Sequence, residues 1–133
     1  MGRILLIDDD HNFTDFLTGH IRTSYPLLQV ELCDNPLAAR QAISAGGYDL
    51  MLIDLEIPGC NGLELLTFAI ESGADKNRIV IISDREADFL HQICPMGSCL
   101  AVLNKFEVRQ KAVLEMILSS VSRKSAARSG APA

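Results

Sequence analysis

The stretch YDLMLIDLEIPGCNGLELL, residues 48–66, decides the fold class of this chain. It begins with an apolar run that ends in a single acid, Asp54, and continues through a Pro-Gly turn into a helix-like pattern. A short apolar run bounded by turn residues is typical of a strand buried on both faces. Because burial penalises a charged side chain, a carboxylate at the end of such a strand indicates a site if neighbouring strands also end in polar residues.

The remainder of the chain repeats this alternation of strand and helix. Apolar or alternating runs predict five strands, at residues 3–8, 28–33, 48–54, 78–83 and 99–103. Helical spacing predicts five helices. The first is marked by Phe13, Phe16, Leu17 and Ile21, and the second begins at Asn35 and Pro36 and buries Ala39, Ala42 and Ile43. The third is marked by Leu63, Leu66 and Ile70, and the last two lie at 85–94 and 107–122. Strands that alternate with helices imply parallel pairing and right-handed crossovers. The predicted fold class is therefore α/β, a doubly wound five-stranded parallel sheet with helices on both faces.

Composition and length limit the number of domains, the class of protein and the type of ligand to consider. The chain has 133 residues, enough for one domain with a real core, here expected over residues 1–122. The small, polar and basic segment 123–133 is expected to be a disordered tail or the start of a linker. A net charge of −5 gives no footprint for direct nucleic-acid binding and is compatible with binding a cation. The N-terminal apolar run is too short for a signal peptide or membrane span, so a cytoplasmic protein is expected. The four cysteines of the chain lack C-x-x-C spacing.

The predicted strand ends carry the residues of chemical interest. Ligands bind at the carboxyl ends of the strands in an open parallel sheet. Here those ends carry Asp8, Asp9 and Asp10, then Asp54, then Ser83, then Asn104 and Lys105. Carboxylates suit Mg²⁺, a hard cation that prefers oxygen ligands. A metal and a lysine can neutralise a phosphoryl group, and a carboxylate can itself be the nucleophile that accepts it.

Four motifs in this order resemble the receiver domain of two-component response regulators, over about residues 3–122. ILLIDDD resembles the first strand with its acidic pair, and LMLIDLEIPGCNGLELL the segment with the phosphorylated aspartate. IVIIS resembles the strand that ends in a Ser/Thr switch residue, and LNK the strand that ends in a lysine. The resemblance implies a flavodoxin-like sheet of strand order 2-1-3-4-5.

The resemblance also implies roles for individual residues. Asp54 would be the phosphoacceptor, and Lys105 would pair with it and then with the phosphoryl oxygens. Ser83 would hydrogen-bond a phosphoryl oxygen. The Mg²⁺ ligands would be Asp9, Asp54 and the backbone carbonyl of Glu56, with Asp8 binding directly or through water. Such a domain catalyses its own phosphorylation and dephosphorylation only and is not otherwise an enzyme.

The resemblance implies protein partners rather than a membrane. The donor would be a phosphohistidine on a sensor histidine kinase or a phosphotransfer protein. The recipient of the signal would be a downstream effector or an output domain. The face formed by the fourth helix, the fifth strand and the fifth helix would be the docking surface and a candidate dimer interface.

Four positions depart from the family pattern. Phe106 follows Lys105 where proline is usual, and because a non-proline cis bond costs about 2.5–4 kcal/mol, this peptide is expected to be trans. Val102 replaces an aromatic switch residue, so signalling is expected to proceed by loop movement. Asp84 either caps a helix that begins at Arg85 or leans over the pocket and tunes phosphorylation, with Arg85 offsetting its charge. Glu56 occupies a position that affects the lifetime of the phosphoryl group.

Three alternatives fit the residues less well than a receiver domain. A pseudo-receiver, a constitutive protein-interaction module, usually lacks the acceptor or the lysine, and both are present here. A haloacid-dehalogenase-like phosphatase would use Asp8 and Asp10 as its Asp-x-Asp pair, but Asn12 stands where that motif has Thr or Val. A calcium loop that begins at Asp8 fails at Phe13, which replaces the required glycine.

Overall fold

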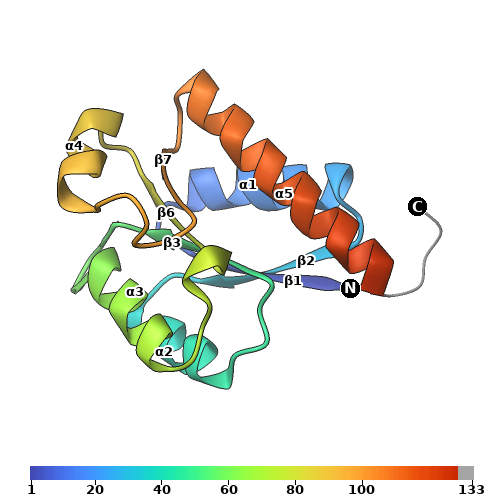
Figure 1. Cartoon of the computed structure of the whole chain (residues 1–133), viewed down its shortest axis with the longest axis horizontal. Coiled ribbons are helices and arrows are strands. Elements are labelled where there is room, and N and C mark those ends of the chain that lie inside the picture. Colours follow the sequence, from blue (N-terminus) through green and yellow to red (C-terminus); the bar gives the residue numbers. More distant parts are fainter. Residues whose placement is uncertain (129–133) are drawn as a thin grey trace.

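Five parallel strands form the centre of the molecule, which is described here by a computed structural model covering residues 1–128 (Figure 1). The strands are β1 (Gly2–Ile7), β2 (Leu28–Cys33), β3 (Leu50–Asp54), β6 (Ile79–Ser83) and β7 (Ala101–Asn104). Their order across the sheet is β2-β1-β3-β6-β7, and every neighbouring pair is parallel. This is the predicted order 2-1-3-4-5, so the predicted fold class is confirmed.

Helices cover both faces of this sheet (Figure 1). They are α1 (His11–Ser24), α2 (Pro36–Ala45), α3 (Gly62–Glu71), α4 (Ala87–Ile93) and α5 (Val108–Arg128), with a 3₁₀ turn η1 at Lys76–Arg78. Apolar side chains of α1 and α5 pack on one face of the sheet, and those of α2, α3 and α4 pack on the other. Covered on both sides, β3 and β6 are buried along their whole length, which explains why they are apolar up to their last residues, Asp54 and Ser83.

Local signals in the sequence set several helix and turn boundaries. The Asn35 side chain accepts a hydrogen bond from Ala38 N, and Pro36 is the first residue of α2, as predicted. After β3, Pro58 and Gly59 form the turn between two short antiparallel strands, β4 (Glu56–Ile57) and β5 (Cys60–Asn61). Gly59 has φ of 82°, a conformation that favours glycine at the third position of such a turn.

Three predicted details are wrong. The helix predicted at 85–94 begins at Ala87, because the backbone of Arg85 bonds to Ser83 Oγ and to the Asn104 side chain instead of entering a helix. The strand predicted at 99–103 begins at Ala101. Two apolar residues that marked the helical spacing, Phe16 and Ile70, are 66% and 41% exposed, whereas α3 buries Leu65, Leu66 and Ala69.

The last helix is longer than the sequence pattern predicts. α5 continues to Arg128, so the expectation of disorder is wrong for residues 123–128, and residues 129–133 lie outside the described part of the chain. Tertiary contacts explain the extension, because Ser125 is buried and Arg128 Nη1 lies 2.7 Å from Asp49 Oδ1. Within residues 1–128, no helix combines the length and apolar character needed to cross a membrane.

Candidate functional site

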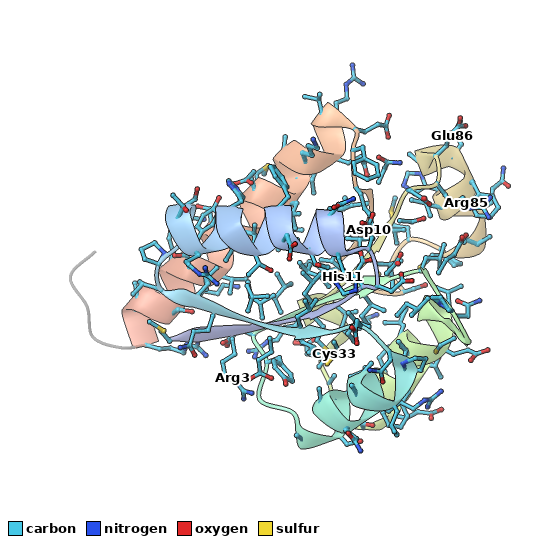
Figure 2. All side chains as sticks on the ribbon, turned by 180° about the vertical axis from the view of Figure 1, so that it is seen from behind. Arg3, Asp10, His11, Cys33, Arg85 and Glu86 are labelled. Carbon is cyan, nitrogen blue, oxygen red and sulfur yellow. The ribbon has the colours of Figure 1, made fainter. Side chains whose placement is uncertain are left out.

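The polar residues predicted at the strand ends do meet at one edge of the sheet. Strand register explains this, because Ile7 pairs with Ile53, Asp54 pairs with Ile82, and Ser83 pairs with Asn104. The loops after β1, β3, β6 and β7 therefore start along the same edge of the sheet. Figure 2 shows this end of the molecule, where Asp10 precedes α1, His11 begins it, and Arg85 and Glu86 precede α4.

Three carboxylates form the centre of this edge. Oxygen atoms of Asp8, Asp9 and Asp54 all lie within 4.8 Å of one another. Asp8 is 1% exposed and Asp54 is 5% exposed, whereas Asp9 is half-buried. Asp8 Oδ1 accepts a hydrogen bond from Asp10 N, and Asp54 Oδ1 accepts a long one of 3.4 Å from Glu56 N. These few hydrogen bonds do not satisfy three clustered carboxylates.

The fourth acid of this region has a separate, structural role. The side chain of Asp10 accepts hydrogen bonds from Asn12 N and Phe13 N and so caps the start of α1. Because the Asp10 carboxylate is committed to the helix, Asp8 and Asp10 do not form the Asp-x-Asp pair that a haloacid-dehalogenase-like phosphatase would need.

Lys105 supplies the cation that faces the acidic cluster. Its side chain is only 5% exposed, and Nζ lies 2.6 Å from Asp8 Oδ2 and 3.7 Å from Asp54 Oδ2. The ammonium also lies 4.7 Å from the centre of the Phe13 ring, a cation–π contact that sequence analysis did not anticipate. Lys105 was expected to pair with Asp54, and the structure places it closer to Asp8.

The single positive charge of Lys105 does not balance the negative charge of the three clustered carboxylates. Burial and the nearby charge of Asp8 raise the pKa of Asp54 to about 7 from its usual 3.8, against the opposing effects of Lys105 and the Glu56 hydrogen bond. Asp8 Oδ2 is buried, and its partner is the Lys105 ammonium at 2.6 Å. A divalent cation fits such a set of oxygen donors, because it would offset the negative charge that one lysine leaves unbalanced.

Ser83 and Asn104 form hydrogen bonds with the backbone of the loops that follow β6 and β7. Ser83 is 1% exposed and its Oγ accepts a hydrogen bond from Arg85 N, which leaves the hydroxyl proton free to donate. The Asn104 side chain donates to Arg85 O and accepts from Phe106 N and Glu107 N. Sequence analysis gave Asn104 no role, although an asparagine at a strand end is a typical turn former.

Phe106 replaces proline without forcing a cis bond. No peptide bond among residues 1–128 is cis, so the expected trans peptide after Lys105 is confirmed. The Phe106 ring packs edge-on against Phe13, at 6.2 Å between ring centres, and Phe13 in turn contacts the Lys105 ammonium. The two aromatic rings thus form one wall of the lysine site.

An ion pair joins the segment after β3, which carries Glu56, to the loop after β6, which carries Arg85. Arg85 Nε lies 2.8 Å from Glu56 Oε1, and about half of each side chain is exposed. The Arg85 guanidinium also lies 5.1 Å from the centre of the Phe89 ring. Asp84 is exposed and does not cap a helix, since α4 begins later with Glu86 at its N-cap position, so the capping interpretation of Asp84 is wrong.

Gly62 is a residue of this site that sequence analysis missed. A Cβ atom added there would lie 2.4 Å from Asp54 O and 2.7 Å from Leu55 Cα, distances that real side chains do not reach. Gly62 N also donates to Leu55 O, at 2.7 Å. The start of α3 can therefore lie directly against the backbone that carries Asp54, and only glycine allows this approach.

Comparisons with known proteins agree with this geometry. A family model, the response regulator receiver domain, matches residues 4–117. Among curated proteins, the uncharacterized transcriptional regulatory protein YkoG of Bacillus subtilis (strain 168) is 32% identical over 65 residues, which cover 49% of this chain and 28% of YkoG. The match therefore spans less than a third of that relative's length.

Solved structures show the same fold. The response regulator TrrA of Thermotoga maritima, in complex with Mg²⁺-BeF, has a TM-score of 0.74 at 21% identity, covering 91% of this chain and 99% of that one. The receiver domain of the sensor histidine kinase PA1611 of Pseudomonas aeruginosa PAO1, with a magnesium ion in its active site cleft, has a TM-score of 0.73 at 20% identity, covering 92% and 98%. At these identities the likeness supports the fold alone.

Proposed function

The chain belongs to the response regulator receiver domain family, and we propose that it accepts a phosphoryl group on Asp54. The donor is a phosphohistidine of a sensor histidine kinase or a phosphotransfer protein. One observation carries the proposal: the Asp54 carboxylate ends a buried strand with two further carboxylates within 4.8 Å and the Lys105 ammonium at 3.7 Å. An anionic donor that approaches this carboxylate needs positive charge to offset the acidic cluster, and Lys105 supplies part of it.

The residues of the site divide the chemistry among them. An Asp54 oxygen attacks phosphorus in line with the leaving group, so that the new O–P bond forms as the P–N bond breaks and the imidazole keeps its electron pair. Lys105 is placed to exchange part of its contact with Asp8 for a phosphoryl oxygen. The free proton of Ser83 donates to another phosphoryl oxygen. Charge stabilisation by such preorganised groups is the principal contribution expected here.

Mg²⁺ is the proposed cofactor. Asp8, Asp9, Asp54 and the backbone carbonyl of Glu56 would hold it, and the structural support is the cluster of three carboxylates whose charge one lysine does not balance. When bound, it supplies positive charge that offsets the repulsion between the carboxylates and an anionic donor. Removing it should therefore stop phosphorylation while leaving the chain folded.

The proposed output is a change in protein docking. The Arg85 backbone bonds to both Ser83 and Asn104, so movement of the Ser83 hydroxyl toward a phosphoryl group disturbs the loops that lead into α4 and α5. The face formed by α4, β7 and α5 is thus the proposed surface for an effector, an output domain or a second copy. Direct nucleic-acid binding is not part of the proposal.

Intact mass spectrometry tests the acceptor assignment. With acetyl phosphate and Mg²⁺, the protein should gain the mass of one phosphoryl group, and chelation of Mg²⁺ should prevent the gain. Asp54→Asn should abolish it, because an amide cannot form the acyl phosphate. Asp49→Asn, at the other end of β3, is the matched control and should be phosphorylated normally. A full gain on Asp54→Asn would refute the proposal.

A further inference from the structure

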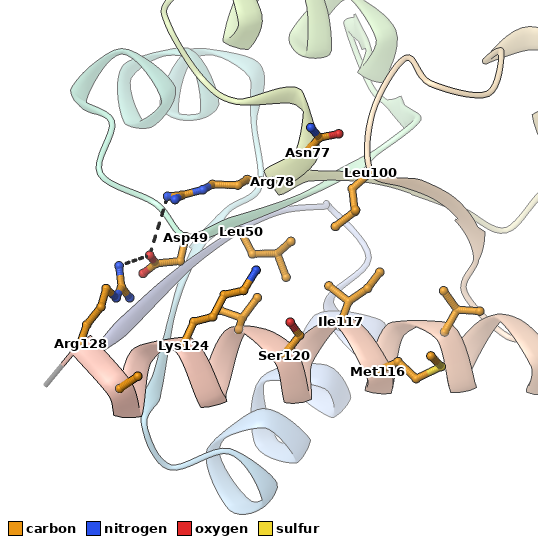
Figure 3. Close-up of a pocket in the computed structure, with 13 residues that line it drawn as sticks. Asp49, Leu50, Asn77, Arg78, Leu100, Met116, Ile117, Ser120, Lys124 and Arg128 are labelled. Carbon is orange, nitrogen blue, oxygen red and sulfur yellow. Dashed lines mark hydrogen bonds and ion pairs between the residues drawn. The ribbon is translucent and has the colours of Figure 1, made fainter. Parts of the chain in front are cut away.

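A groove of about 670 Å³ lies beside α5, at the opposite edge of the sheet from Asp54 (Figure 3). Its floor includes Leu50, the first residue of β3, and its sides come from α5, η1 and the segment just before β7. Sites for small molecules commonly measure about 300–1,000 Å³. The groove shares no residue with the carboxylate cluster.

One half of the groove is apolar. Its lining there consists of Leu50, Leu100, Val113, Met116, Ile117 and Val121. Leu50 is buried at the base, whereas Leu100 and Met116 remain 42% and 71% exposed along the sides. The result is a concave strip of apolar surface in contact with water, which favours an aliphatic occupant.

The other half of the groove is cationic. Arg78, Lys124 and Arg128 line it together with a single carboxylate, Asp49. Asp49 is fully engaged: Oδ1 faces Arg128 at 2.7 Å and Arg78 at 4.0 Å, and Oδ2 accepts a hydrogen bond from Arg3 N. Three cationic side chains against one carboxylate leave two surplus positive charges, in a chain whose net charge is −5.

Lys124 is the cation available to a ligand. No ion pair or hydrogen bond joins its ammonium to any of residues 1–128, and the residue is exposed. Figure 3 shows Lys124 and Arg128 at one end of the groove and Ile117, Leu100 and Met116 toward the other. An occupant that satisfies both ends must carry a negative head and an apolar chain.

We propose that this groove binds a single-chain amphiphilic anion, with its carboxylate at Lys124 and its aliphatic chain along Leu100 and Ile117. A cationic amphiphile of the same length would place its charge against the arginines. A flat membrane surface would not reach the recessed floor at Leu50. The proposal therefore commits to a monomeric anion held inside the groove.

A titration with matched amphiphiles tests the charge and chain requirements. Decanoate, kept below its micelle concentration, should bind saturably and shift the amide NMR signals of residues 113–124 and Leu100. Octanoate should bind more weakly, by about fourfold per methylene if the chain is fully buried. Decyltrimethylammonium should not bind. Equal binding of the cationic amphiphile, or shifts confined to other surfaces, would overturn the proposal.

Variants on α5 locate the binding site. Lys124→Glu should weaken decanoate binding at least about tenfold, because it exchanges attraction for repulsion at the head group. Lys111→Glu makes the same charge change at an exposed position of the same helix outside the groove, so it should leave binding nearly unchanged. Met116→Ser should weaken decanoate binding with little effect on acetate. Equal losses for both lysine variants would show a general charge effect and reject the site.

Two other occupants would give different results. Binding to anionic phospholipid vesicles without binding of monomeric decanoate would identify a membrane surface and overturn the proposal. Signal shifts in the groove that follow protein concentration and ignore decanoate would identify a second copy and also overturn it.

Discussion

Two aspartates at the two ends of the same strand, Asp49 just before β3 and Asp54 at its end, differ sharply in their surroundings. Asp49 faces two arginines and a backbone N–H. Burial alone would raise the pKa of Asp49, but the hydrogen bonds from Arg128 and Arg3 and the arginine charges hold it below its usual value. Asp54 shares one lysine with Asp8, and its pKa is raised to about 7 by burial and by that neighbouring carboxylate.

The difference separates a structural carboxylate from a functional one. Asp49 is satisfied by groups of the folded chain, and its ion pairs fasten the end of α5. Asp54 is left with unfavourable electrostatics that a bound cation would relieve. Strongly perturbed carboxylates cluster at functional sites because their chemistry needs them unsatisfied in the resting state.

Removing the cation at each end should have the largest and most unequal effect. Lys105→Met leaves the buried side chains of Asp8 and Asp54 without a cation, and loss of one partner of a buried ion pair costs about 3 kcal/mol. Urea denaturation at pH 8 without divalent cations should show this loss. Arg128→Met is the matched control at Asp49 and should change stability far less, because that arginine is exposed. Similar losses for both variants would contradict the comparison.

Neutralising the two aspartates should change stability in opposite directions at neutral pH. In the folded state Asp54 keeps its proton up to about pH 7, whereas in the unfolded chain it loses it near its usual 3.8. The wild type therefore loses stability as pH rises through this window, and Asp54→Asn avoids the loss. Its gain at pH 8 should be about 2 kcal/mol, less than the full conversion of about 1.4 kcal/mol per pKa unit, because the folded site can relax around the charge.

The pH dependence supplies the control for this measurement. The gain from Asp54→Asn should largely disappear near pH 4, where Asp54 is protonated in the folded state and about half protonated in the unfolded chain, and should shrink when Mg²⁺ is added to the wild type. Asp49→Asn should be destabilising at pH 8, because a lowered pKa contributes stability that is lost only as pH falls through the acid range. Thermal unfolding from pH 4 to 8 measures both, and a stabilising Asp49→Asn would break the comparison.

Phosphorylation should move the loops at the Asp54 end and leave the Asp49 end unchanged. Val102 has no aromatic ring to rotate, so the loops after β3 and β6 should carry the change. We expect amide exchange in these loops to differ by about tenfold between the acetyl phosphate-treated and untreated protein, or about 1.4 kcal/mol. Residues 100–103 and the segment around Asp49 should differ less. The largest change in β7 would show that this switch mechanism is wrong.

Asp84 should have the smallest effect of these residues. Its capping role is excluded by the start of α4 at Ala87, and its remaining proposed role is electrostatic tuning of the phosphorylated state. Asp84→Ala should raise the phosphorylation rate with acetyl phosphate roughly two- to fivefold, because an exposed charge is largely screened. Glu86→Ala removes an exposed acid two residues further on and should change the rate less. Equal rates for wild type and Asp84→Ala would reject the tuning role.

Sequence patterns predicted the strands, their order and the strand-end residues well. Buried parallel strands must be apolar throughout, so β1, β3 and β6 stand out in the sequence, and the residue after each strand is then placed by topology. Helix faces were predicted less well. Phe16 and Ile70 fit helical spacing but point outward, because a stripe of apolar residues does not specify which of two adjacent rows meets the sheet.

The start of α4 and the partner of Lys105 depended on contacts between distant segments. Asn104 bonds to the Arg85 backbone from 19 residues away and keeps it out of the helix. Lys105 lies closer to Asp8 than to Asp54, a difference of 2.6 Å against 3.7 Å that no spacing in the sequence encodes. Gly62 likewise has a role only because α3 begins against the backbone of Asp54.

By itself, the sequence determined the fold class and the group of carboxylates, serine and lysine that shares one edge of the sheet, and its resemblance to a known family supplied the strand order. The fold class and the shared edge follow from periodicity and from the rule that ligands bind where parallel strands end. Only the tertiary structure decided the length of α5, the ion pair between Glu56 and Arg85, and the opposite electrostatics of Asp49 and Asp54. Such features depend on distances of a few ångströms between segments far apart in the chain, where Coulomb energy and burial change steeply with position.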